Sequence, residues 1–296
     1  MKKLLFIVLT ALLFISCDVI DNPELVPSFI QIDEFNLTSS SNQGTSSNKI
    51  KDCWVYADSK LVGIFELPAR IPIFLNGSYN VQIYPGIYKN GVQEERVIYP
   101  FYTNFDSIID LKAGETIELA PEIEYRDNLN FWVEDFEDPG FKLNMFVSNS
   151  DTTMFIAKQS QYTGLFEGDA GLIKMSSTNI LCEMRTDEPL FDQLPRDLNT
   201  PAYFEMDYKC NHSFLFGLLD NNTGLSAYNR TTLITFNPTL DENGVAQWNK
   251  TYLYIPDVTN FYQNATKFDF FISVFNNDGT DGIEVYVDNL KVVFDN

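Results

Sequence analysis

Short runs of aromatic and β-branched residues follow one another along the chain from residue 29 onward, and this pattern most constrains the fold. Turn signals built from glycine, proline and asparagine separate the runs at intervals of about 8 to 12 residues, which is typical of β-sandwiches. Helical periodicity is scarce beyond residue 17, so long amphipathic helices are not expected. The pattern predicts an all-β chain, and 296 residues suffice for two domains.

The first predicted domain covers residues 29–126. Residues 53–65 alternate like a hairpin, and residues 76–77 (Asn-Gly) mark a tight turn. The segment resembles a PEGA-type domain and its Ig- or transthyretin-like relatives, which implies a β-sandwich. Ser59 departs from the usual glycine of these domains, and the insertion at residues 90–106 is longer than such a domain needs. The resemblance rests on residues 55–63, 72, 75–81, 85–86 and 114–115.

At the start of this domain, residues 29–37 are expected to form a strand. Residues 38–48 are rich in serine, threonine, asparagine and glycine, and they are expected to form a flexible loop.

The second predicted domain covers residues 127–296. It opens with Asp-Phe-Glu at 135–137 and closes with Val-Asp-Asn-Leu at 287–290. These ends resemble those of jelly-roll carbohydrate-binding modules, in which the two motifs lie on neighbouring strands. The resemblance implies a jelly roll, and it implies a sugar ligand more weakly. Residues 277–279 (Asn-Asp-Gly) predict a hairpin turn near the end.

The amino terminus has the pattern of a secretory signal peptide over residues 1–16. Its apolar run is too short for a membrane-spanning helix, which needs about 20 residues. Residues 13–17 resemble a bacterial lipobox, which implies cleavage before Cys17 and its acylation, with palmitate among the chains. Acidic residues in the spacer at 17–28 resemble the export signals of Bacteroidetes-type lipoproteins, so an outer-membrane location in the cell envelope is expected. The alternative is an ordinary signal peptide with a chance cysteine.

Charge excludes one class of partner. The chain has 41 Asp+Glu against 20 Lys+Arg, a formal net charge of −21, so phosphate backbones repel it and no nucleic-acid binding is expected. Anionic lipid head groups repel it as well, so attachment to the membrane would come through the N-terminal lipid. The remaining partner classes are a polysaccharide and an envelope protein.

The cysteines beyond residue 17 leave two alternatives open. Cys182 and Cys210 can pair, with Cys53 left over, or all three can be buried thiols that act as small apolar residues. No CxxC motif or Cys/His cluster is present, so a zinc site is not expected.

The jelly-roll resemblance implies a structural Ca²⁺ between the two terminal strands. Carried over to this chain, Glu137 and Asp288 would be ligands, with Glu134 or Asp135 as helpers, and backbone carbonyls and water would complete the six to eight oxygens that Ca²⁺ takes. The alternative is that these acids are solvated or cap the end of a strand.

A catalytic role is not expected. Glu205-Met206-Asp207 resembles the start of the Glu-x-Asp-x-x-Glu motif of laminarinase-like jelly-roll hydrolases, but Cys210 stands where the second glutamate belongs, and the unbulged variant of the motif would need an acid at Lys209. A retaining glycosidase needs that second carboxylate about 5 to 5.5 Å from the first. Alternation instead predicts that Glu205 and Asp207 lie on a solvated sheet face.

A glycan site would need exposed aromatic platforms with polar partners. Packing in the core is the alternative for each aromatic residue. Two three-residue motifs, at Ser107 and Thr152, resemble Bacteroidetes O-glycosylation acceptors. The candidate platforms are Trp132, Trp248, Tyr203, Tyr208, Tyr228, Tyr252, Tyr254 and Tyr262.

Together these features predict a non-catalytic envelope lipoprotein that binds a glycan or another envelope component through its jelly-roll domain. The first alternative is a structural or assembly lipoprotein with a protein partner. The second is a jelly-roll glycoside hydrolase.

Overall fold

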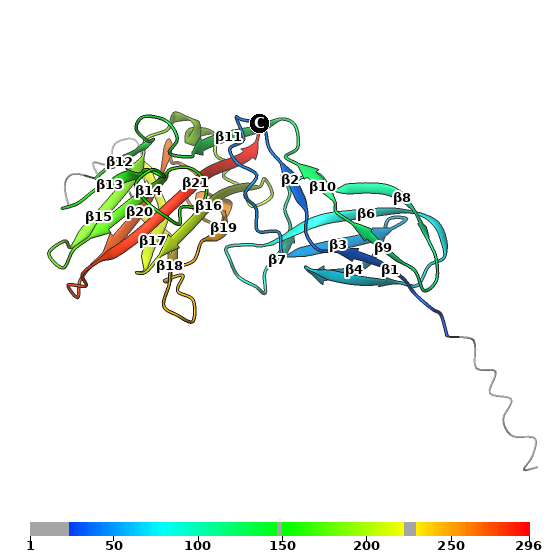
Figure 1. The fold of residues 1–296 in the computed structure, drawn as a ribbon. Helices are drawn as coiled ribbons and strands as arrows, with labels where there is room; N and C mark the ends of the chain where they lie inside the picture. The colour runs from blue at the N-terminus through cyan, green and yellow to red at the C-terminus, as the bar shows by residue number, and fades with distance from the viewer. Residues whose placement is uncertain (1–23, 147–149, 222–228) are drawn as a thin grey trace, which may run out of the picture.

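The computed structural model describes residues 24–146, 150–221 and 229–296 (Figure 1). The predictions for the signal peptide at 1–16, for Cys17 and for Tyr228 lie outside these ranges. The predicted all-β fold is confirmed, because within the described ranges the helical elements are short: η1 (Pro189–Gln193) and α2 (Pro256–Thr259). None of the helices described there has the length and apolar character needed to span a membrane.

The first ten strands form a sandwich. One sheet has the order β4-β3-β6-β7, with β8 also paired to β6, and the other has the order β5-β1-β9. A short parallel pair, β2 with β10, leads toward the second half. The strands are β1 (Ser28–Ile32), β2 (Asn36–Thr38), β3 (Asp52–Ala57), β4 (Lys60–Glu66), β5 (Ala69–Ile73), β6 (Gly77–Tyr88), β7 (Arg96–Ile98), β8 (Phe105–Leu111), β9 (Thr116–Leu119) and β10 (Glu122–Glu124).

The remaining strands form the second sandwich. One sheet has the order β13-β14-β21-β16-β19, with β11 also paired to β21, and the other has the order β12-β15-β20-β17-β18. The chain passes repeatedly from one sheet to the other, as in a jelly roll. The strands are β11 (Leu129–Glu134), β12 (Leu143–Met145), β13 (Met154–Ala157), β14 (Ala170–Met175), β15 (Leu181–Thr186), β16 (Ala202–Cys210), β17 (Phe214–Asn221), β18 (Asn229–Phe236), β19 (Asn249–Tyr254), β20 (Lys267–Phe275) and β21 (Ile283–Asp295).

Two local predictions are corrected. Residues 29–37 do not form one strand: β1 ends at Ile32, and β2 pairs with β10 in a separate sheet. Residues 277–279 are not a hairpin turn, because β20 and β21 belong to different sheets and the connection crosses the sandwich. In both cases, the sheet that the next strand joins is decided by partners that are distant in the sequence.

The two sandwiches lie against each other, and no strand is common to both (Figure 1). The core of the first sandwich includes Tyr203, Tyr252 and Val293 from the second. Much of the contact comes from the insertion at residues 90–106, where Tyr99 is fully buried and packs edge-to-face against Tyr203. The insertion is therefore one of the segments that join the first sandwich to the second.

Hydrogen bonds also join the first sandwich to β19, the edge strand of one sheet of the second sandwich. Asn90 donates its backbone N–H to the Tyr252 carbonyl at 2.8 Å, and its side-chain oxygen accepts the Tyr254 N–H at 2.8 Å. The loop predicted to be flexible, residues 38–48, packs here too: Ser47 is buried and donates to Asp207 at 2.9 Å. Contacts with the second sandwich hold this loop in place, and these contacts could not be predicted from the composition of the loop.

Candidate ligand-binding site

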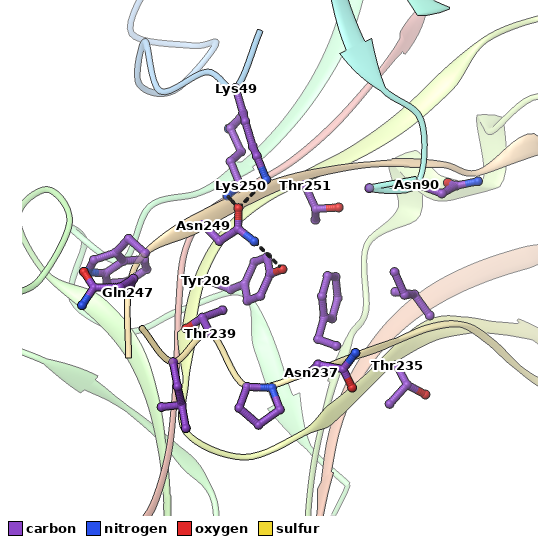
Figure 2. A pocket seen from close by; sticks show the side chains of 16 residues that line it. Lys49, Asn90, Tyr208, Thr235, Asn237, Thr239, Gln247, Asn249, Lys250 and Thr251 are labelled. Atoms are coloured by element: carbon purple, nitrogen blue, oxygen red, sulfur yellow. Dashed lines mark hydrogen bonds between the residues drawn. The ribbon is translucent and has the colours of Figure 1, made fainter. Parts of the chain in front are cut away.

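A pocket of about 460 Å³ opens where the two sandwiches meet (Figure 2). Its roof is formed by residues 247–251, at the start of β19, and its floor by residues 234–240, the end of β18 and the loop after it. The first sandwich contributes Lys49, Asn90 and Gly91 to the rim. The volume lies within the range of about 300–1,000 Å³ found for small-molecule sites.

Neutral polar side chains dominate the lining. Asn249 lies at the centre: its Nδ2 donates to the Tyr208 hydroxyl at 2.9 Å, and its Oδ1 accepts from the Lys49 ammonium at 2.5 Å (Figure 2). Thr235 and Asn237 are exposed on the floor, and their side chains have no hydrogen bond to the described part of the chain. These amide and hydroxyl groups can both donate to and accept from a ligand.

Thr251 supplies a polar group that is buried and unpaired. Its residue is 4% exposed, and its hydroxyl oxygen has no hydrogen-bond partner among the described residues. A buried hydroxyl without a partner costs about 1–3 kcal/mol. Because Thr251 lines the pocket, a ligand or water there can satisfy it.

Trp248 gives the pocket an aromatic wall. The indole N–H donates to the Gly164 carbonyl at 2.9 Å, and the ring lies 5.7 Å from that of Phe166. The Lys209 ammonium lies 5.2 Å from the indole centroid. These contacts fix the half-buried ring, so it is preorganised as a platform.

The other predicted platforms are placed elsewhere. Trp132 is in the core of the second sandwich, and Tyr203 and Tyr252 are buried in the interface, so they present no platform. Tyr208 is buried but offers its hydroxyl to the pocket. Tyr254 and Tyr262 are half-buried. Of the aromatic candidates in the described ranges, Trp248 and Tyr208 therefore reach this pocket.

The prediction that Glu205 and Asp207 lie on a solvated face is wrong. They are 0% and 2% exposed, because the first sandwich covers this face of the sheet. The Glu205 carboxylate accepts from the hydroxyls of Tyr99 at 2.7 Å and Tyr125 at 2.9 Å, and the Lys250 ammonium lies 3.3 Å away. Alternation alone could not distinguish a face covered by protein from one covered by water.

The buried charges form one network across the interface. Burial alone would raise the pKa of Glu205, but Lys291 and Lys250 outweigh it and hold that pKa below its usual value. Burial lowers the pKa of Lys291 to about 8, and its ammonium donates to Tyr125 at 2.7 Å. The pKa of Lys250 is raised: burial opposes the shift, but the carboxylates of Asp207 and Glu205 outweigh it. The network therefore holds Glu205 and Asp207 in the buried interface.

The acids predicted to bind calcium are held in different ways. Glu134 is buried and accepts the backbone N–H groups of Phe136 and Lys142, and Glu137 accepts that of Asp169. The half-buried Asp135 accepts the N–H of Glu137 at 3.3 Å. Within the described ranges, no three acidic, histidine or cysteine side chains are arranged to hold a metal.

Asp288 differs from the other acids predicted to bind calcium, because one of its buried carboxylate oxygens has no hydrogen-bond partner in the described structure. Burial raises the pKa of Asp288 to about 9, and repulsion from Asp207, Glu167 and Glu137 adds to the shift. An unpaired buried oxygen beside other acids is compatible with a cation, so the calcium site stays a prediction. The closing motif lies on β21, but the opening motif at 135–137 lies just beyond β11, the strand that pairs with β21.

The three described cysteines, Cys53, Cys182 and Cys210, are free, buried thiols, so Cys182 and Cys210 form no disulfide here. Burial raises their pKa values to about 12, 12 and 11. The two candidate glycosylation residues, Ser107 on β8 and Thr152 in a loop, are half-buried.

Comparisons with known proteins find solved structures that resemble this chain at low sequence identity. No protein-family model matches the chain, and no curated protein does. The K1 cleaved adhesin domain of Lys-gingipain from Porphyromonas gingivalis W83 has 12% identity and a TM-score of 0.38, covering 55% of this chain and 97% of that domain.

Two further similar structures are carbohydrate-binding modules. The family 11 module of a cellulosomal cellulase from Clostridium thermocellum has 9% identity and a TM-score of 0.37, covering 55% of this chain and 94% of the module. The non-crystalline-cellulose-specific module CBM28 has 16% identity and a TM-score of 0.37, covering 53% and 91%. At these TM-scores the similarities carry no argument about function.

Proposed function

We propose that this chain is a non-catalytic protein that binds a glycan in the pocket between its two sandwiches. The observation that carries the proposal is the lining: a fixed indole ring beside amide and hydroxyl groups, one of them buried and unpaired. Aromatic faces pack against sugar rings, and paired donors and acceptors match sugar hydroxyls. The burial of Glu205 supports the non-catalytic part, because Tyr99 and Tyr125 of the first sandwich cover its carboxylate.

Binding can be tested with the full-length chain on a glycan array, followed by calorimetry on each hit. Trp248→Ala is expected to weaken binding by more than about tenfold, since stacking on an aromatic ring is lost. Asn237→Ala is expected to weaken it about fivefold without changing thermal stability, because this side chain has no partner in the described chain. Asn243→Ala, on an exposed turn outside the pocket, is the matched control. Binding that survives both pocket variants would contradict the proposal.

We further propose that the chain is exported and anchored to the cell envelope, at the outer membrane, by acylation of Cys17. The support is the signal-peptide pattern of residues 1–16 and the lipobox resemblance. Metabolic labelling with a palmitate analogue tests this, and Cys17→Ser should abolish the label.

A protein partner is the second candidate, and one surface favours it. On the outer face of the first sandwich, Trp54 lies between Ile64 and Tyr84 on adjacent strands. Leu61, Ile64 and Ile108 are 52%, 42% and 75% exposed. A photo-crosslinker at Ile108 should capture an envelope protein on cells if this face is a docking surface.

A further inference from the structure

The pocket carries positive charge in a strongly acidic chain. Its lining includes Lys49 and Lys250 and no aspartate or glutamate. An adjoining hollow of about 340 Å³ shares four residues with it, and adds Lys51 and Asp207. Acids outnumber bases 41 to 20 in the chain as a whole, so this lining reverses the overall charge balance.

The charges of Lys250 and Asp207 are already balanced by neighbouring groups. The Lys250 ammonium lies 3.3 Å from Glu205 and 3.6 Å from Asp207. Asp207 also accepts from Ser47 at 2.9 Å and from Asn289 at 3.1 Å. Lys250 and Asp207 therefore belong to the interface network and leave little charge for a ligand.

Lys49 and Lys51 are different, because neither forms an ion pair with a carboxylate in the described part of the chain. The Lys49 ammonium bonds to the neutral amide oxygen of Asn249. Burial and, second, repulsion from Lys51 lower the pKa of Lys49. Two half-buried ammonium groups that repel each other beside a pocket are stabilised by an anion, since charge-assisted hydrogen bonds are about twice as strong as neutral ones.

We infer that the ligand of this pocket is an acidic glycan, whose carboxylate or sulfate group lies against Lys49 and Lys51. This inference rests on the proposed glycan function. The amide and hydroxyl groups around Asn249 would bind the sugar hydroxyls, and Trp248 would pack against a ring. A neutral glycan would fill the same space but leave both ammonium groups without a counter-charge.

The test uses matched pairs of probes with the full-length chain, measured by calorimetry. Oligogalacturonide is compared with its methyl-esterified form, and chondroitin sulfate oligosaccharide with its desulfated form. The charged member of at least one pair is expected to bind about tenfold more tightly. High salt should reduce that difference, because it screens charge. A difference within the galacturonide pair would indicate that a carboxylate is recognised, and a difference within the chondroitin pair would indicate that a sulfate is recognised.

Lysine variants identify the charges involved. Lys51→Gln is expected to weaken binding of the charged probe about five- to tenfold while leaving the neutral probe unchanged. Lys49→Gln should act in the same direction, and Lys60→Gln, an exposed lysine at the hairpin end of β4, should have no effect. Equal binding within both pairs would overturn the inference and leave the proposed function intact. No binding of any glycan, charged or neutral, would overturn both.

Discussion

At the scale of single residues, the turn between β3 and β4 stores strain that can be measured. Asp58 and Ser59 both have positive φ, 46° and 64°, as a two-residue turn of type I′ requires. The right-handed twist of the hairpin imposes this geometry, and glycine adopts it at least cost. The serine was recognisable from the sequence as a departure, but its conformation needed the strand register.

Ser59→Gly is therefore expected to raise the free energy of unfolding by about 0.5–1 kcal/mol. Urea denaturation measures it. Ser59→Ala removes the same hydroxyl but keeps the strain, so it should bring no gain. A glycine variant less stable than the alanine variant would contradict this account.

A second residue-scale prediction concerns pH. The pKa of Lys291 is about 8 in the folded chain, below its ordinary value of 10.5. Between these values the unfolded chain holds a proton that the folded chain has released, so stability from this group rises with pH. The gain is about 1–2 kcal/mol between about pH 7.5 and 9.5.

The measurement is the unfolding free energy of the native chain minus that of Lys291→Met, taken across this pH range. Subtracting the value of the variant removes the contributions of the other titrating groups to the pH dependence. The difference should increase with pH. A difference that decreases would mean that burial does not disfavour the charged lysine.

At the scale of elements, β11 and β21 show what a motif can specify. Their pairing ends with Glu134 opposite Leu290, so the opening motif begins beside the closing one, although it lies outside the strand that the resemblance implied. The insertion at residues 90–106 shows the opposite case. Its sequence gave no sign that Asn90 would bond the edge of β19, because that contact joins residues more than 160 positions apart.

The calcium prediction belongs to these two strands. If Ca²⁺ binds at Asp288, it should raise the stability of the folded chain by about 2.7 kcal/mol at a hundredfold excess over Kd. Thermal melts with Ca²⁺ and with a chelator measure this, and Asp288→Asn should remove the difference. Asp110→Asn, an exposed acid on β8, is the control. Identical melts of the native chain in both conditions would refute the site.

At the scale of the whole molecule, we expect the buried network to make the two sandwiches one cooperative unit. Glu205 on β16 receives hydrogen bonds from two tyrosines of the first sandwich and lies beside Lys250 of the second. Removing one partner of a buried ionic network leaves uncompensated charge, which costs about 3–5 kcal/mol.

Glu205→Gln should therefore lower the free energy of unfolding by about 3–5 kcal/mol. It should also split one calorimetric transition into two, as the sandwiches lose their coupling. Glu118→Gln, exposed on β9, should change stability by less than about 0.5 kcal/mol. A loss as small as that of the control would show that the network does not couple the sandwiches.

The sequence by itself determined the all-β class and several of the strands, because alternation and turn chemistry act between near neighbours. It also identified Trp248 as a candidate platform, although not its partners. Only the tertiary structure decided that Glu205 and Asp207 are buried and that Lys49 meets Asn249 across 200 residues. The physical reason is that side-chain periodicity specifies which face of a strand a residue occupies, whereas the surface packed against that face comes from another part of the chain.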